Sequence, residues 1–136
     1  MVDDDHLIRL HACDILEEFG FECLAAPAAD MALVLLEANA PSVTLLFTDV
    51  QMPGKIDGFA LARVAAAHWP HIGIVVASGE RSPEADDLPA SARFVAKPFS
   101  VDVVLRHLTE ILPEAQQPDP LREHRRRFSG SGNMSN

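Results

Sequence analysis

The chain has 136 residues, of which 48% are hydrophobic, and this suits one compact domain with a core of its own. Its net charge of −9 argues against nucleic acid as a partner, because phosphates demand clustered positive charge, and favours metal cations or a basic partner. No apolar run approaches the roughly 20 residues that a membrane span needs, and the N-terminus has no signal-peptide pattern, so we expect a cytoplasmic protein without membrane contact.

Apolar residues recur at helical spacing from Leu7 to Phe19, and Gly20 is a natural terminator of this first predicted helix. Residues 21–25 are predicted to form a short strand, and residues 31–38, rich in Leu and Ala, a second helix. The near-continuous apolar run from Val43 to Thr48 predicts a strand that is covered on both faces in a parallel sheet.

The second half of the chain continues this alternation. Residues 58–68 are predicted to be helical, and residues 73–77 to form another covered strand. Residues 92–96 form a last short strand. Ser100 can then cap a helix whose apolar stripe runs to Leu112.

Three segments depart from the regular pattern. Only Met1 and Val2 precede the first acidic residues, so the first strand is predicted to be very short. Between residues 79 and 94 two prolines leave too few residues for a stable helix, which predicts a shortened fourth helix. From Pro113 the composition is too polar to build a core, so we expect a domain over residues 1–112 and a disordered tail over residues 113–136.

Alternating strands and helices predict an α/β fold, a parallel sheet with helices on both faces and right-handed crossovers. In such a fold functional groups collect at the carboxyl ends of the strands. Those ends carry the candidate site residues Asp3, Asp4, Asp49, Ser78 and Lys97.

Three carboxylates at one sheet edge would repel one another unless a cation neutralised them. Oxygen ligands select a hard divalent ion, and Mg²⁺ suits phosphoryl transfer because it keeps positions for phosphate oxygens. Asp49 is then the candidate nucleophile. Lys97 would supply a positive charge, and the Ser78 hydroxyl a hydrogen bond, to phosphoryl oxygens.

Each of these residues also has a simpler interpretation. Asp3 and Asp4 could belong to a solvated acidic run, and Asp49 could be a turn former before Pro-Gly. Ser78 could belong to a turn and Lys97 to the surface. Their joint appearance after successive strands, in order, favours a single site over these separate roles.

Four segments, MVDDD, LLFTDVQMPGKIDGF, VVASGE and FVAKPF, together resemble the receiver domain of bacterial two-component response regulators. The resemblance covers Met1 to about Leu112. It implies a flavodoxin-like, doubly wound, five-stranded parallel sheet of order 2-1-3-4-5. It also implies a role in phosphorelay signal transduction, in which a sensor histidine kinase or a phosphotransfer protein donates a phosphoryl group.

The resemblance implies roles for individual residues. Asp49 would accept the phosphoryl group in a Mg²⁺-dependent reaction. The metal ligands would be Asp3, Asp4, Asp49 and the backbone carbonyl of Gln51.

Three further roles follow from the same resemblance. Lys97 would contact the phosphate, and the bond between Lys97 and Pro98 would be cis. Ser78 and Phe94 would form the switch pair, with Phe94 swinging inward as Ser78 moves toward the phosphate.

The sequence departs from the pattern of this family in two further places. The turn over residues 54–58 is one residue longer than usual, which could change the loop over the metal without moving Asp49. Phe94 lacks the hydroxyl of the more frequent tyrosine. The shortened segment before Phe94 also leaves open which partners the signalling face would bind.

The leading hypothesis is a signalling switch that is not an enzyme beyond its own phosphorylation and dephosphorylation, and that changes its protein contacts when Asp49 is modified. The downstream partner is unknown, and a homodimer is left open. A second hypothesis is an aspartate-nucleophile phosphatase for small phosphate esters, which would need a second acid where Gln51 stands. A phosphorylation-independent interaction module is the third.

The two cysteines, Cys13 and Cys23, are too few for a disulfide framework and lack the spacing of a zinc site. We therefore interpret them as reduced thiols that serve as small core residues.

Overall fold

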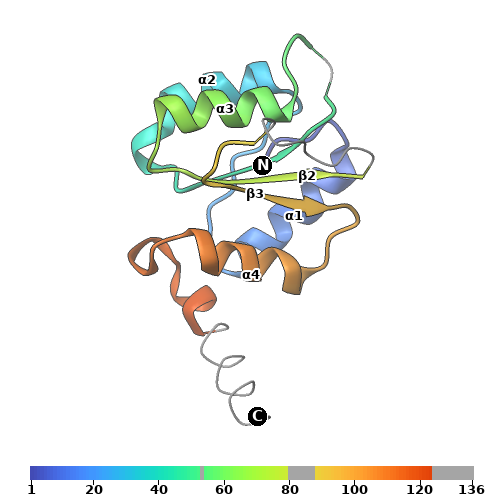
Figure 1. Ribbon diagram of the computed structural model, residues 1–136. Helices are drawn as coiled ribbons and strands as arrows, with labels where there is room; N and C mark the ends of the chain where they lie inside the picture. The colour runs from blue at the N-terminus through green and yellow to red at the C-terminus, as the bar shows by residue number, and fades with distance from the viewer. Residues whose placement is uncertain (53, 80–87, 124–136) are drawn as a thin grey trace.

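The protein folds into three layers, a parallel sheet between two pairs of helices. The computed structural model describes residues 1–52, 54–79 and 88–123. Helices α2 and α3 cover one face of the sheet and α1 and α4 the other, as Figure 1 shows. In chain order the elements are α1 (His6–Glu18), α2 (Ala29–Asn39), η1 (Ala40–Ser42), β1 (Leu45–Asp49), α3 (Gly58–His68), β2 (Gly73–Ser78), β3 (Ala92–Ala96), α4 (Val101–Ile111) and η2 (Glu114–Gln116).

The sheet has three regular strands among the described residues, in the order β1-β2-β3, and all pairs are parallel. Val2 extends it by one position, because it forms parallel bridges to Thr48 on one side and to Ala26 on the other. The spatial order is therefore the region of Ala26, then Val2, then β1, β2 and β3. This agrees with the predicted flavodoxin-like order 2-1-3-4-5, in which the first two strands are reduced to bridges.

The strand predicted over residues 21–25 was wrong, because this segment pairs only through the bridge at Ala26. A strand here needs a neighbour to pair with, and its neighbour in the sheet consists only of the short stretch around Val2. The very short first strand was predicted correctly. The prediction of a shortened fourth helix concerns residues 80–87, which lie outside the described residues.

Side chains cap the first turns of three helices. The Asp5 side chain accepts hydrogen bonds from the backbone N–H groups of Leu7 and Ile8 at the start of α1. Asp57 caps α3, and Ser100 caps α4 as predicted. Within the described residues, no helix is both long enough and apolar enough to cross a membrane.

The core consists of two clusters, one on each face of the sheet. Phe47 and Val75 face α1 and α4, whereas Leu46 and Ile74 face α2 and α3. Because the side chains of a strand alternate between faces, strands buried on both faces require the continuous apolar runs seen in the sequence. The two helix layers therefore hold the sheet from opposite sides and fix the carboxyl ends of its strands.

Cys13 and Cys23 form a disulfide between α1 and the segment that follows it, so the prediction of reduced thiols was wrong. The Cα atoms of the two residues lie 5.8 Å apart, inside the range that a disulfide requires. Cys13 is buried in the α1 and α4 cluster, and Cys23 packs against that cluster. Two cysteines ten residues apart say nothing in sequence about whether the chain reverses between them, and this is why the pairing was missed.

The segment after Pro113 folds back onto the domain up to residue 123, where we expected a disordered tail. Leu121 is fully buried in the α1 and α4 cluster. Gln117 is buried too, and its side-chain amide donates to the carbonyl oxygen of Leu112 at 2.9 Å, at the end of α4. Gly20, with a φ of +96°, packs against Pro118 so closely that an added Cβ would lie 2.6 Å from the proline Cβ. Residues 124–136 lie outside the described residues.

The buried Leu121 gives a direct test of this ordered extension. We expect Leu121→Ala to lower the free energy of unfolding by about 2–5 kcal/mol, because it leaves a cavity in the core. Urea unfolding followed by circular dichroism measures the change. Glu123→Ala, on the exposed side of the same segment, is the matched control and should change stability by less than about 0.5 kcal/mol. Equal stabilities of the two variants would mean that the extension does not pack on the domain.

Candidate functional site

Asp49 is the last residue of β1 and lies where the chain leaves the sheet. Its N–H donates to the carbonyl oxygen of Val2 at 2.8 Å, and its side chain is largely buried. The chain returns close by at Gly58, whose N–H donates to the carbonyl oxygen of Val50 at 2.8 Å. A Cβ on Gly58 would lie 1.8 Å from the carbonyl oxygen of Asp49, so only glycine fits at this crossing. Strand and turn together hold the Asp49 carboxylate at the sheet edge.

Asp3 is held by the short N-terminal strand and is fully buried. Its N–H donates to the carbonyl oxygen of Ala26 at 3.1 Å, and its carboxylate accepts from the N–H of Asp5 at 2.9 Å. Arg9 on α1 donates to the backbone carbonyl of Asp3 at 2.8 Å. We did not identify Arg9 from the sequence, where its place one turn after the helix cap Asp5 was the only available signal.

Lys97 joins the two buried carboxylates. Its ammonium lies 2.9 Å from a carboxylate oxygen of Asp3 and 2.9 Å from one of Asp49. The backbone N–H of Lys97 donates to the carbonyl oxygen of Ser78 at 2.9 Å, which places it just beyond β3. The peptide bond between Lys97 and Pro98 is cis, as the resemblance implied. Residues from three separate segments therefore meet at one point, as predicted.

For both Asp49 and Lys97, burial and the contact between the two side chains shift the pKa in opposite directions. Burial raises the pKa of Asp49 above its ordinary value, and the charge of Asp3 adds to this, although the hydrogen bond from Lys97 acts the other way. Burial alone would lower the pKa of Lys97, but its hydrogen bonds to Asp3 and Asp49 outweigh this and raise it. Lys97 is therefore held in its charged form, while the ionised form of Asp49 remains costly.

Asp4 completes a group of three carboxylates. Oxygen atoms of Asp3, Asp4 and Asp49 all lie within 4.8 Å of one another, and Asp4 is exposed. Lys97 supplies one positive charge against three negative ones, so the group keeps a surplus of negative charge. An all-oxygen set with this surplus has the chemistry of a site for a hard divalent cation such as Mg²⁺.

The three acids open onto a depression of about 580 Å³ at the carboxyl edge of the sheet. Gln51, Ser78 and Lys97 line it together with Met52 and Gly79, so that the predicted metal, hydroxyl and ammonium groups share one cavity. Phe94 is not part of its lining. It lies in β3, paired in register with Val76, and is half-buried.

The chain matches the family model described as response regulator receiver domain over residues 1–109. It is 32% identical to the response regulator protein FleR of Pseudomonas aeruginosa over 89% of this chain and 26% of that protein. It is 30% identical to the chemotaxis protein CheY of Bacillus subtilis over 82% of this chain and 94% of that protein. The chain spans about a quarter of the length of the first curated relatives it matches.

Solved structures agree with the fold. The receiver domain of the hybrid histidine kinase CckA superposes with a TM-score of 0.70 at 28% identity, over 82% of this chain and 95% of that one. A response regulator receiver protein from Sinorhizobium medicae gives a TM-score of 0.75 at 25% identity, over 81% and 89% of the two chains.

A flavodoxin-like sheet that gathers acids and a lysine at its carboxyl edge places the protein in the class of doubly wound α/β domains, whose functional groups lie at the carboxyl ends of the strands. Within that class, the chain belongs to the family of response regulator receiver domains, and it acts in two-component phosphorelay signalling. The resemblance inferred from the sequence and the predicted fold class are both confirmed.

Because the pKa of Asp49 is raised, ionising its side chain should lower the stability of the folded protein, and this loss should depend on pH. A folded-state pKa above the unfolded value gives stability that is present below the ordinary value of 3.8 and lost as the pH rises through the folded-state pKa. In metal-free buffer we therefore expect Asp49→Asn to unfold at a higher urea concentration than the wild type at pH 7, and at the same concentration near pH 3. In this variant the Lys97 ammonium still has its ion pair with Asp3, so the substitution does not leave it without a partner.

Urea unfolding with a chelator present, repeated across this pH range, measures the gap between the unfolding midpoints of the wild type and Asp49→Asn. Asp14→Asn, an exposed aspartate on α1, is the matched control and should show no such gap. A gap that stays constant with pH would contradict the assignment of the cost to the Asp49 charge.

Proposed function

We propose that Asp49 is the phosphoacceptor of this receiver domain and that it takes its phosphoryl group from a histidine of a sensor kinase or a phosphotransfer protein. One observation carries the proposal: Asp49 ends a buried strand at an open depression and shares the Lys97 ammonium with Asp3. A carboxylate oxygen of Asp49 forms the new bond to phosphorus. The bond from phosphorus to the donor imidazole breaks, and its electron pair stays on the leaving nitrogen.

Mg²⁺ fits the acidic group as the cofactor of this transfer. Asp3, Asp4 and Asp49, with the backbone carbonyl of Gln51, would hold it. When bound, it supplies positive charge that offsets the repulsion between these carboxylates and the incoming phosphoryl oxygens. Asp3 and Asp49 are already fixed by backbone and ammonium contacts, so little ordering of the protein is needed.

Lys97 and Ser78 act on the phosphoryl group rather than on its donor. In the unphosphorylated protein Lys97 contacts Asp3 and Asp49. Once Asp49 carries the phosphoryl group as an acyl phosphate, its carboxylate charge is lost and the phosphoryl oxygens bring negative charge, so the ammonium can turn to one of these oxygens. Ser78 lies at the end of β2 and lines the same depression, from which its hydroxyl can donate to another oxygen. Neither residue is needed as a base.

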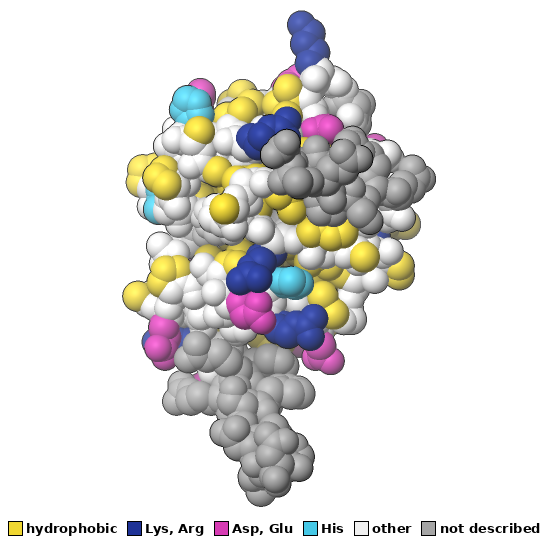
Figure 2. All heavy atoms as spheres, in the orientation of Figure 1, with side chains coloured by type: hydrophobic (Ala, Val, Ile, Leu, Met, Phe, Trp, Pro, Cys, Tyr) yellow, Lys and Arg dark blue, Asp and Glu magenta, His cyan; other side chains and the backbone are white. Residues whose placement is uncertain are grey.

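The switch would pass from Ser78 to the surface over β3 and α4 through Phe94. Phe94 is paired with Val76 two residues before Ser78, so a shift of the β2 end changes its packing. Figure 2 shows basic, acidic and histidine side chains gathered side by side over this part of the molecule. Arg93 of β3 and Glu110 of α4 form an exposed ion pair there, 3.7 Å apart. We propose this surface as the contact for a downstream protein or for a second copy of the chain.

The module is proposed to be a switch in the cytoplasm and not an enzyme for other substrates. The alternative, an aspartate-nucleophile phosphatase, needs an acid two residues after the nucleophile to protonate a leaving group. Gln51 stands at that position and has no proton to give at neutral pH. The family assignment favours the signalling role.

Binding of Mg²⁺ is tested without any phosphoryl donor. A ligand that binds only the folded state at 100 times its dissociation constant adds about 2.7 kcal/mol to stability. We therefore expect Mg²⁺ to raise the melting temperature of the wild type by several degrees and that of Asp4→Asn far less. Asp14→Asn should respond like the wild type. Equal responses of all three proteins would remove the metal from the proposal.

Phosphorylation is tested with a small acyl phosphate as donor. We expect intact-protein mass spectrometry to show the gain of one phosphoryl group when Mg²⁺ is present, and peptide mapping to place it on Asp49. Asp49→Ala should show no gain, and chelation of the metal should abolish labelling of the wild type. Asp14→Ala, which alters an exposed aspartate on α1 outside the depression, is the control and should label normally. Equal labelling of wild type and Asp49→Ala would defeat the assignment of the phosphoacceptor.

A further inference from the structure

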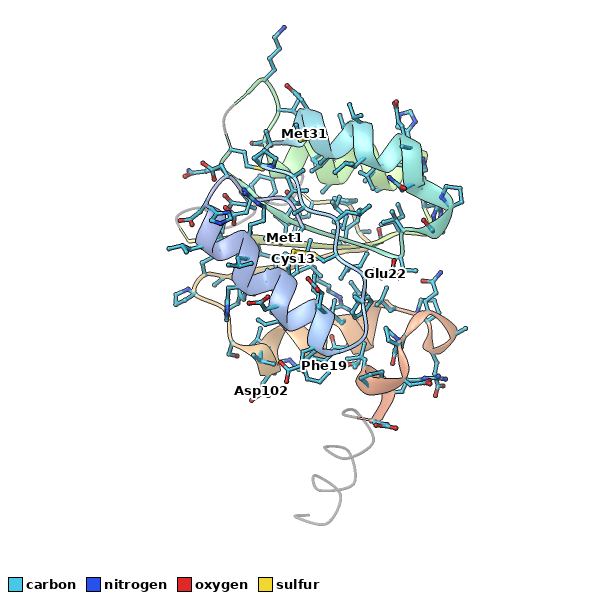
Figure 3. All side chains as sticks on the ribbon, turned by 180° about the vertical axis from the view of Figure 1, so that it is seen from behind. Met1, Cys13, Phe19, Glu22, Met31 and Asp102 are labelled. Atoms are coloured by element: carbon cyan, nitrogen blue, oxygen red, sulfur yellow. A yellow bond between two sulfur atoms is a disulfide. The ribbon has the colours of Figure 1, made fainter. Side chains whose placement is uncertain are left out.

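The disulfide between Cys13 and Cys23 joins α1 to the segment that follows it. Cys13 lies within α1, and Cys23 lies in the irregular segment of residues 21–25. Figure 3, which shows the molecule from behind, places Cys13 on the side of α1 that faces the segment carrying Glu22. The chain contains only these two cysteines, so each is the other's only possible disulfide partner within it. Neither residue lines the depression of the phosphoacceptor site.

The segment that carries Cys23 is connected through its backbone to Asp3. The carbonyl oxygen of Ala26 accepts from the N–H of Asp3 at 3.1 Å, and the N–H of Ala26 donates to the carbonyl oxygen of Met1 at 3.0 Å. Residues 21–25 form no regular strand, and the pairing of this segment in the sheet is limited to the bridge at Ala26. A bond that holds Cys23 on α1 therefore also restricts Ala26 and, through it, the backbone of Asp3.

The two sulfur atoms differ in their access to solvent. Cys13 is 7% exposed and lies in the α1 and α4 cluster, whereas Cys23 is half-buried and packs against the outside of that cluster. Thiol–disulfide exchange begins when a thiolate attacks one sulfur atom, and its rate depends on which sulfur can be reached. Cys23 is therefore the accessible target, and Cys13 is the leaving group.

The turn between the two cysteines has backbone hydrogen bonds of its own. The N–H of Gly20 donates to the carbonyl oxygen of Glu17 at 3.1 Å. The N–H of Phe21 donates to the carbonyl oxygen of Leu16 at 3.0 Å. Free cysteines are small and hydrophobic, so both can stay packed at the core after reduction. The thiols would then remain close together, and oxidation could restore the same pair without unfolding the domain.

We propose that Cys13 and Cys23 form a reversible redox site, opened at Cys23 by a dithiol reductant, whose state sets how firmly Asp3 is held for the metal. The effect on the metal rests on the function proposed above. Disulfides in a reducing cytoplasm are usually transient and serve catalysis or redox sensing, so the proposed location favours a switch over a permanent crosslink. The disulfide form restrains the backbone of Asp3, and reduction should therefore weaken the binding of Mg²⁺.

The exchange proceeds in two steps. A thiolate of the reductant bonds to the Cys23 sulfur, the S–S bond to Cys13 breaks, and its electron pair stays on the Cys13 sulfur, which takes up a proton. The second thiolate of the reductant then attacks the reductant's own sulfur in the mixed disulfide and releases Cys23, which takes up a proton as well. The reductant loses two electrons and becomes a disulfide, and the protein gains two thiols.

The redox site is tested first on the folded wild type. The oxidised protein is treated with dithiothreitol without denaturant, alkylated with iodoacetamide and analysed by mass spectrometry. We expect alkylation of both cysteines after reduction and of neither before it, with a circular dichroism spectrum that shows a retained fold. Removal of dithiothreitol and addition of oxidised glutathione should restore the form that iodoacetamide does not label. A disulfide that opens only in denaturant, or a pair that does not re-form in the folded protein, would overturn the redox site.

Hydrogen exchange measured by NMR in metal-free buffer tests the connection to Asp3. We expect the amides of Asp3 and Ala26 to exchange about fivefold or more faster in the reduced protein, relative to the amide of Val50, which is hydrogen-bonded to β2. The double variant Cys13→Ala/Cys23→Ala has no sulfur to exchange and is the matched control. It should resemble the reduced wild type and should not respond to dithiothreitol. Unchanged relative exchange at both amides would mean that the redox site does not act on Asp3.

The affinity for Mg²⁺ is measured by calorimetry on the oxidised and the reduced wild type. We expect reduction to weaken binding about fivefold or more, the lower end of the usual coupling between two sites. Equal affinities in the two states would overturn the regulation of the metal site. Labelling of Asp49 by the acyl phosphate is measured on the same samples. Absence of both Mg²⁺ binding and labelling in either state would contradict the function proposed above and the regulation built on it, whereas the alkylation measurement would still decide the redox site.

Discussion

The Lys97 ammonium and the two carboxylates that it joins, Asp3 and Asp49, are the interaction on which the rest of this site depends. Removing charges from water costs more than a simple ion pair returns unless the geometry is good, so a buried pair alone is weak grounds for stability. Here one cation serves two buried acids, and Asp4 adds a third negative charge at the surface. The group therefore keeps a surplus of negative charge, which a metal cation could offset.

The scaffold fixes each member of this group through backbone contacts. Asp49 is held between Val2 and β2, Asp3 between Ala26 and the start of α1, and Lys97 by its N–H to Ser78. Groups mounted on paired strands keep their positions better than groups on loops. The parallel sheet therefore explains why residues that are 94 positions apart in sequence can share one hydrogen bond.

The elements that were predictable from sequence are those whose signal is local. The strand that ends at Asp49 and the helix start at Ser100 are each indicated by a few consecutive residues, and both were predicted. The errors concern contacts between distant segments. Residues 21–25 lost their strand because the partner is too short, and Leu121 orders a polar segment because one leucine finds a core that forms elsewhere in the chain. The convergence of Asp3, Asp49 and Lys97 was predictable because parallel strands bring their carboxyl ends together whatever the details of packing.

The two ends of the sheet are built differently. At the carboxyl end, Val2 and Asp3 need only a few backbone hydrogen bonds to place a carboxylate beside Asp49, and these bonds are present. At the amino end, an apolar cavity of about 440 Å³ lies between residues 21–24 and residues 43–46, and Met1 and Val2 line it.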